Sequence, residues 1–271
     1  MSKKKTLINQ LDIDAICMAF DELARPHIQE VEVIEELESS NSYLLGQTIE
    51  VAQARLCAVE SQSKGRGRRG NEWLSTPNKN IMMSMSWGFA EWPESITGLG
   101  LAVALIVAER LNADYQLDVE IKWPNDLLVN GDKLAGVLVD VAGEARGACN
   151  VVLGLGLNVK QDDWSKSDTA YAWTDLHSLG IDLDRNVFIG QIISDWVLML
   201  QSFESNGFAP LAERWAKLSS YADKKIAVGD PTSKIIGRMQ GVDQTGALVV
   251  ISEDNKEHVF SDSNVSVRLV D

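Results

Sequence analysis

Residues 60–70 read ESQSKGRGRRG, and the last seven of them, Lys64–Gly70, contain four cations and three glycines. Glycine lets the backbone adopt positive φ and approach a ligand closely, and arginine binds carboxylate or phosphate oxygens through two parallel N–H groups. Such a loop favours a small anionic ligand. The same run is also compatible with a solvated basic loop or with a surface patch that binds nucleic acid. The sequence around the loop has to decide among these three interpretations.

The composition is that of an ordinary globular chain. Its 271 residues are 45% apolar, enough for one large and one small domain. A formal net charge of -14 disfavours general binding to nucleic acids and to anionic membranes, because the far field repels polyanions. A cluster of cations inside such a field points to a small anionic ligand.

Neither the cysteines nor the apolar runs indicate export or membrane insertion. Cys17, Cys57 and Cys149 lack CxxC spacing and are typical of reduced core residues in a cytoplasmic protein. The residues after the basic start are too polar for the core of a signal peptide. The most apolar run, Leu99–Leu111, is well short of the roughly 20 residues that span a bilayer, so it is predicted to be a buried helix.

Hydrophobic spacing and turn residues divide the first part of the chain into strands and helices. Helices are expected over residues 7–24, from Ser42 towards Glu50, and over 97–111. Strands are expected over residues 31–37, 51–59, 80–87, 119–123, 127–129, 134–140 and 150–159.

Two features of these strands bear on a site. The Asn130-Gly131 pair predicts a tight hairpin, which would bring Lys133 near Lys122 and Asp126. The strand over residues 150–159 contains glycines, which in a strand interior indicate close approach by a ligand or by another backbone.

The second part of the chain has a different pattern of polar and apolar residues. A polar loop is expected over residues 160–170, followed by helices over 186–203 and 208–218. Asp184 or Asn186 is expected to cap the first of these helices. From about Ala222 short β runs separated by turns predict a small SH3-like barrel.

Taken in order, these motifs resemble those of biotin protein ligases, and the match covers nearly the whole chain from about residue 31. The motifs are Ser39-Ser40-Asn41, Gln62 ahead of GRGRRG at 65–70, Trp73, KWPND at 122–126, KLAG at 133–136 and GLGLN at 154–158. The loop combined with KWPND and KLAG in this order is highly specific. The serine pair replaces the more familiar Ser-Thr and keeps a hydroxyl in place.

The resemblance implies an α+β fold. It predicts a mixed-sheet catalytic domain of the class II aminoacyl-tRNA synthetase/biotin ligase type over residues 31–221. An N-terminal helical extension would occupy residues 1–30, and the SH3-like barrel residues 222–271. Bifunctional members carry an N-terminal winged helix that represses transcription. Residues 1–30 leave no room for three helices, so the monofunctional type is expected.

The resemblance also implies a reaction. The family activates biotin with ATP and Mg²⁺ as biotinyl-5'-AMP, then transfers the biotinyl group to one lysine of a carrier protein. The expected partner is the biotin carboxyl carrier protein domain of acetyl-CoA carboxylase, in the cytoplasm. No specific DNA binding and no membrane association are expected. A homodimer is possible.

Site residues follow from the matching motifs. The catalytic candidates are Arg66, Arg68 and Lys133, which would neutralise the reacting anions, and Asp126, which would orient the carrier lysine and help to remove its proton. The biotin-binding candidates are Ser39, Ser40, Asn41, Gln62, Gly65, Arg66, Gly67, Arg68, Trp73, Lys133, Gly136, Gly154 and Gly156. The ATP and adenylate candidates are Arg68, Lys133, Asn158 and Trp173. No protein ligand for a metal is assigned.

Several of these residues have a purely structural alternative. Ser39 or Ser40 is also a plausible helix cap. Trp73 and Trp173 are also typical core residues. Asp126 with a nearby lysine would make a surface salt bridge of little consequence, and Arg69 would simply be solvated.

Two other functions compete with biotin ligation. A lipoate or octanoate ligase shares the fold and the adenylate chemistry, but the GRGRRG loop and KWPND argue against it. A nucleic-acid-binding regulator would use Lys64–Arg69 as its contact. The strong acidity of the chain disfavours the regulator.

Overall fold

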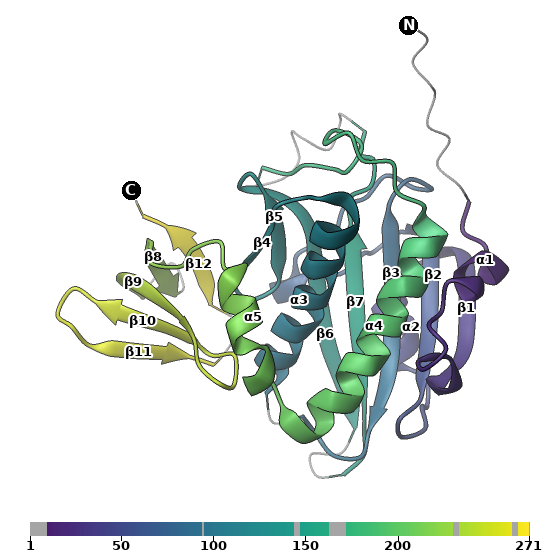
Figure 1. Cartoon of the computed structure of the whole chain (residues 1–271), viewed down its shortest axis with the longest axis horizontal. Helices are drawn as coiled ribbons and strands as arrows, with labels where there is room; N and C mark the ends of the chain where they lie inside the picture. Colours follow the sequence, from purple (N-terminus) through teal and green to yellow (C-terminus); the bar gives the residue numbers. More distant parts are fainter. Residues whose placement is uncertain are drawn as a thin grey trace, which may run out of the picture. The chain divides into compact units, whose positions relative to one another are not determined.

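The computed structural model describes residues 10–93, 95–143, 147–162, 172–229, 233–261 and 265–270. Its chain forms two compact units. The first contains Met1–Trp92 and Asp132–Leu198, and the second contains Pro93–Gly131 and Met199–Asp271. The domain boundaries expected from the sequence remain a prediction. Figure 1 labels the helices and strands of both units.

The first unit contains a mixed sheet whose strands follow the order β1-β2-β3-β7-β6. These are β1 (Ile28–Leu37), β2 (Ala54–Gln62), β3 (Ile81–Phe89), β7 (Cys149–Leu157) and β6 (Asp132–Gly143). The β1–β2 pair is parallel, whereas β2–β3, β3–β7 and β6–β7 are antiparallel. The predicted α+β class with a mixed sheet is confirmed.

Side-chain hydroxyls and carboxylates cap the N-termini of the helices in this unit. Asp12 caps α1 (Ile13–Met18), which is shorter than the expected helix and is followed by a 3₁₀ turn at Arg25–His27. Ser39 caps α2 (Ser40–Leu45), which therefore starts two residues earlier than predicted. The backbone N–H groups of Asn186 and Val187 donate to Asp184, which caps α4 (Arg185–Asn206) as the sequence indicates.

The two faces of this sheet carry different partners. Leu44 of α2 packs against Cys57 and Val152 in one buried cluster. Glu60 lies three residues after Cys57 on β2, so its side chain points to the opposite face. There it binds Arg185 at the start of α4, the long green helix of Figure 1. Thus α2 and the start of α4 lie on opposite faces of the same sheet.

The second unit combines helices, a hairpin and a small sheet. It contains α3 (Ile96–Tyr115), β4 (Val119–Lys122), β5 (Asp126–Val129), a 3₁₀ turn at Ala209–Leu211 and α5 (Ala212–Lys217). Its five-stranded antiparallel sheet follows the order β11-β10-β9-β8-β12. Those strands are β8 (Lys225–Gly229), β9 (Lys234–Val242), β10 (Leu248–Ser252), β11 (Glu257–Phe260) and β12 (Ser266–Leu269). This is the sheet predicted for the SH3-like barrel.

Two features of the second unit test expectations from the sequence. Asn130 and Gly131 have φ values of 53° and 86°, the left-handed pair that a tight type I′ turn requires. By length and composition alone α3 could cross a membrane, but 67% of the relevant window is buried within the protein. It is therefore a core helix, as its apolar run predicts.

Candidate ligand site on the α2 face

The first turn of α2 supplies three buried polar residues. Ser39, Ser40 and Asn41 are 4%, 3% and 4% exposed. The Oγ atom of Ser39 accepts the N–H of Ser42 at 3.4 Å, so the capping interpretation holds for this residue. Ser40 and Asn41 have different partners, which lie on the sheet beneath the helix.

Ser40 and Asn41 belong to one chain of hydrogen bonds. The backbone N–H of Ser40 donates to Gln62 Oε1 at 2.7 Å, and the Ser40 hydroxyl lies 2.7 Å from that of Ser84. Ser84 in turn donates to Asn41 Oδ1 at 2.5 Å. The structure therefore brings Gln62, Ser40 and Asn41 together as predicted from the motifs, with Ser84 as an unpredicted link.

Asp140 extends this chain to the basic loop. Its Oδ2 atom accepts Asn41 Nδ2 at 2.9 Å and Arg66 Nη1 at 3.0 Å, and its Oδ1 atom accepts Arg66 Nη2 at 3.2 Å. Neither Asp140 nor Ser84 belongs to the motifs from which site residues were predicted. A hydroxyl and a carboxylate inside strands that otherwise read as apolar are the signal that could have found them.

The glycines of β7 and β6 make room for side chains of the site. A Cβ on Gly156 would lie 2.3 Å from Trp73 Cε2, and one on Gly154 would lie 2.2 Å from Asn41 Oδ1. A Cβ on Gly136 would lie 3.2 Å from Trp73 Cζ3. These glycines therefore leave room for the Trp73 ring and the Asn41 amide, so it is side chains rather than another backbone that approach them closely.

The basic loop folds back on itself. Gly67 N–H donates to Asn71 O at 2.7 Å, and Trp73 N–H donates to Gly65 O at 2.9 Å. A Cβ on Gly65 would lie 2.5 Å from Trp73 O, so glycine is needed where the two arms meet. Arg69 has a φ of 60° and is exposed, in line with its expected solvated role. The loop presents Arg66 to Asp140 while its arms are tied by backbone bonds.

Lys133 lies at the start of β6 close to the Trp73 ring. Its Nζ atom is 5.4 Å from the ring centroid, a cation–π distance. Backbone bonds tie Lys133 to Ala172 and Thr174, and the same residue forms an isolated β-bridge with Trp173. Lys133 therefore connects two predicted groups of residues, those for biotin and those for the adenylate.

Asn158 directly follows β7, and Trp173 lies in the segment that pairs with Lys133. Asn158 is 5% exposed, and its Nδ2 atom donates to Thr174 O at 3.0 Å and to Lys133 O at 3.4 Å. Asn158 thus holds the segment that carries Trp173 against Lys133. Trp173 itself is partly buried. The predicted loop over residues 160–170 lies largely outside the described residues.

Asp126 belongs to the second unit. It is the first residue of β5 and pairs in register with Lys122 of β4. Burial raises the pKa of Tyr221 in this unit, and the charge of Asp126 raises it further. The expected proximity of Asp126 to Lys133 would join the two units and remains a prediction.

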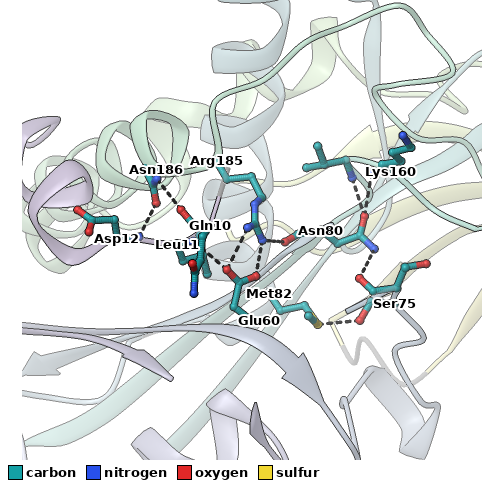
Figure 2. Close-up of polar contacts among 12 residues, drawn as sticks. Gln10, Leu11, Asp12, Glu60, Ser75, Asn80, Met82, Lys160, Arg185 and Asn186 are labelled. Atoms are coloured by element: carbon teal, nitrogen blue, oxygen red, sulfur yellow. Dashed lines mark hydrogen bonds and ion pairs between the residues drawn. The ribbon is translucent and has the colours of Figure 1, made fainter. Parts of the chain in front are cut away.

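On the other face of the sheet a buried ion pair ties strand ends together (Figure 2). Arg185 donates to both oxygens of Glu60 at 2.7 and 3.0 Å, and to the carbonyl of Asn80 at 3.1 Å. The Asn80 amide oxygen accepts the N–H groups of Val159 and Lys160 at 2.8 and 3.1 Å. The ends of β2, β3 and β7, which flank the basic loop and the glycines, are thereby fixed.

Two titratable groups near α2 are shifted by their surroundings. Burial raises the pKa of Cys57 to about 12, which keeps this thiol neutral beneath the helix. The hydrogen bond from the Tyr43 hydroxyl to Glu32 raises the pKa of Tyr43. Cys17, Cys57 and Cys149 are all free thiols. Among the described residues, no group of three or more His, Cys, Asp or Glu side chains could hold a metal ion.

Comparisons with known proteins place this arrangement in a family. Residues 34–158 match the model of the biotin/lipoate A/B protein ligase family. The bifunctional ligase/repressor BirA of Escherichia coli is 36% identical over 222 residues, which cover 81% of this chain and 68% of the relative. The biotin--[acetyl-CoA-carboxylase] ligase of Mycobacterium tuberculosis is 29% identical, covering 81% of this chain and 82% of the relative.

Solved structures agree on the fold. The biotin protein ligase from Aquifex aeolicus in complex with biotin and ATP superposes with a TM-score of 0.75. The match covers 89% of this chain and 100% of that one, at 22% sequence identity. The resemblance expected from the motif order is thus confirmed by sequence relatives and by fold: the chain belongs to the biotin/lipoate A/B protein ligase family.

Proposed function

We propose that this chain is an ATP-dependent biotin protein ligase, which forms biotinyl-5'-AMP and transfers the biotinyl group to a lysine of a biotin carboxyl carrier protein domain. The observation that carries the proposal is the hydrogen-bonded chain of Gln62, Ser40, Ser84 and Asn41 beside Trp73. It offers neutral donors and acceptors next to an apolar ring. Neutral polar groups beside an aromatic wall suit a ureido bicycle with an aliphatic tail.

The polar chain would recognise the head of biotin. A ureido group has one carbonyl acceptor and two N–H donors, all of which lose water when the head is buried. Each one left unpaired would cost about 1–3 kcal/mol. Ser40, Asn41 and Gln62 carry hydroxyl and amide groups able to replace that water. Trp73, seated on Gly136 and Gly156, would pack against the apolar part of the ligand.

The cations would serve the adenylation step. The biotin carboxylate attacks the α-phosphate of ATP, a P–O bond to pyrophosphate breaks, and negative charge concentrates where two anions meet. Arg68 and Lys133 are the proposed neutralising groups, since both are cations, the first in the basic loop and the second beside the Trp73 ring. Lys133 lies 5.4 Å from the Trp73 ring centroid, which would put its charge beside the bound acyl chain.

Mg²⁺ belongs to the proposal only as the companion of the ATP phosphates. It commonly keeps several waters and binds through substrate phosphates with one or two carboxylates. The described residues contain no cluster of three or more potential protein ligands, so no step is assigned to residues acting through the metal.

The transfer step needs a neutral amine. A carrier lysine with a pKa of about 10.4 must lose a proton before it attacks the mixed anhydride and releases AMP. Asp126 is the proposed group that orients the ammonium and helps to remove this proton. Its register partner Lys122 would have to leave the carboxylate accessible for this purpose.

Pyrophosphate release tests the proposal directly. The full chain is incubated with ATP and Mg²⁺ together with biotin, lipoate or octanoate, and pyrophosphate is measured by a coupled assay. Turnover with biotin alone is expected. Turnover with lipoate or octanoate in preference to biotin would instead identify a lipoate-type ligase, and no turnover with any acid would refute the ligase assignment.

A further inference from the structure

Asp140 of β6 binds both Asn41 of α2 and Arg66 of the basic loop. We propose that Asp140 is a positioning residue for biotin: it fixes the orientation of the Asn41 amide and holds Arg66, and so couples α2 to the basic loop. This inference rests on the proposed function. It assigns Asp140 a role that none of the recognised motifs contains.

Asp140 lies between α2 and the basic loop and binds both. Its carboxylate accepts three N–H groups, one from Asn41 on α2 and two from Arg66 in the basic loop. The Oδ2 atom is shared, at 2.9 Å from Asn41 Nδ2 and 3.0 Å from Arg66 Nη1. A movement of the loop that withdrew Arg66 would therefore change the environment of the Asn41 amide, one of the groups proposed to bind biotin.

The protons available on these side chains determine which atoms donate. An ionised carboxylate only accepts hydrogen bonds, so the atom of Asn41 that faces Asp140 must be the Nδ2 donor. Asn41 Oδ1 then faces Ser84, whose single hydroxyl proton it accepts. The Ser84 oxygen can then only accept, and the Ser40 hydroxyl proton has two acceptors, the Ser84 oxygen at 2.7 Å and Gln62 Oε1 at 3.2 Å. The charge of Asp140 thus sets the orientation of the Asn41 amide and, through it, makes Ser84 the donor to Asn41.

Asp140 also compensates the positive charge of Arg66. Both terminal nitrogens of its guanidinium are bound by Asp140, so the pair is neutral as a unit. The Arg66 side chain is 41% exposed and that of Asp140 is 20% exposed, so the pair lies at the surface of the site. Arg66 is therefore a held donor in this arrangement, and the net positive charge for the reacting anions falls to Arg68 and Lys133. This refines the role expected for Arg66 from the sequence.

Asp140→Asn is the main test, because it removes the charge and keeps the shape. Glu30→Gln is the matched control. It removes the ion pair between Glu30 of β1 and Arg55 of β2 on the same sheet, in which Arg55 Nη1 lies 3.0 Å from Glu30 Oε2. Two measurements are made on the full chain, biotin affinity by calorimetry and hydrogen exchange of residues 65–70 without any ligand. Pyrophosphate release at saturating biotin and ATP is recorded for both variants.

Asp140→Asn is expected to weaken biotin binding about ten-fold or more, the size associated with loss of a charge-assisted hydrogen bond. Exchange of residues 65–70 should become faster in the ligand-free protein, while turnover at saturating biotin changes less than affinity. Glu30→Gln should match the wild type in all three measurements. Asp140→Glu, which keeps the charge, should restore part of the affinity.

Wild-type affinity together with wild-type loop exchange in Asp140→Asn would overturn the inference. An equal loss in Glu30→Gln would also overturn it, because the effect would then follow any lost ion pair on the sheet. The exchange measurement needs no turnover, so it judges the link between Asp140 and the loop even if the wild-type protein fails to use biotin. That last result would count against the proposed function alone.

Discussion

Two arginine–carboxylate pairs lie on opposite faces of the same sheet. Arg185 and Glu60 are 1% and 5% exposed, whereas Arg66 and Asp140 are 41% and 20% exposed. In both pairs two guanidinium nitrogens bind two carboxylate oxygens. The chemistry is the same, so the difference in their roles comes from what surrounds each pair.

The buried pair is closed by the protein itself. Glu60 also accepts the N–H of Leu11, and Arg185 also donates to the carbonyl of Asn80 (Figure 2). The pair on the α2 face instead contacts side chains that are candidates for ligand binding. The comparison indicates that the first pair serves stability and the second serves recognition.

The largest expected effect is on the buried pair. Arg185→Met leaves the Glu60 carboxylate buried without its charge partner, and should lower the free energy of unfolding by about 3–5 kcal/mol. Urea denaturation followed by circular dichroism measures the change. Combining it with Glu60→Leu should recover much of the loss, because no lone charge then remains buried. If Arg185→Met were as stable as the wild type, the buried pair would not have the stabilising role assigned to it.

A smaller effect is expected from filling the space under Trp73. Gly156→Ala would put a Cβ 2.3 Å from the ring, so the ring must shift, at a cost of about 1–3 kcal/mol and with weaker biotin binding. Gly46→Ala is the control, since the nearest atom to its Cβ would be 3.6 Å away. Unfolding and calorimetry on both variants check this. Equal behaviour of the two would show that the seat under Trp73 is not tight.

The smallest effect is expected from a third ion pair. Lys64 and Glu38 lie 2.7 Å apart but are 69% and 70% exposed, so solvent screens their attraction. Lys64→Ala should change the free energy of unfolding by less than about 1 kcal/mol and leave biotin affinity unaltered. Denaturation and calorimetry serve again. A marked loss of biotin affinity would instead show that Lys64 takes part in biotin binding.

Much of the fold could be predicted because local patterns carry it. The cap at Ser39, the left-handed Asn130-Gly131 turn and the glycines of β7 each follow from the chemistry of single residues. Ser84, Asp140 and the Glu60–Arg185 pair could not be predicted in this way. Their partners are between 43 and 125 residues away in sequence, and only the register of neighbouring strands and the position of the helices bring them together.

The most direct test of the different roles of the two arginine–carboxylate pairs is denaturation of Arg185→Met and Asp140→Asn, each without biotin and at one fixed, saturating biotin concentration. A ligand that binds only the folded state stabilises it in proportion to the logarithm of its affinity. Arg185→Met should lose stability and keep most of its biotin-induced gain. Asp140→Asn should stay within about 1.5 kcal/mol of the wild type without biotin and lose about 1.4 kcal/mol of the gain. The reverse pattern, or equal losses in both variants, would contradict the account.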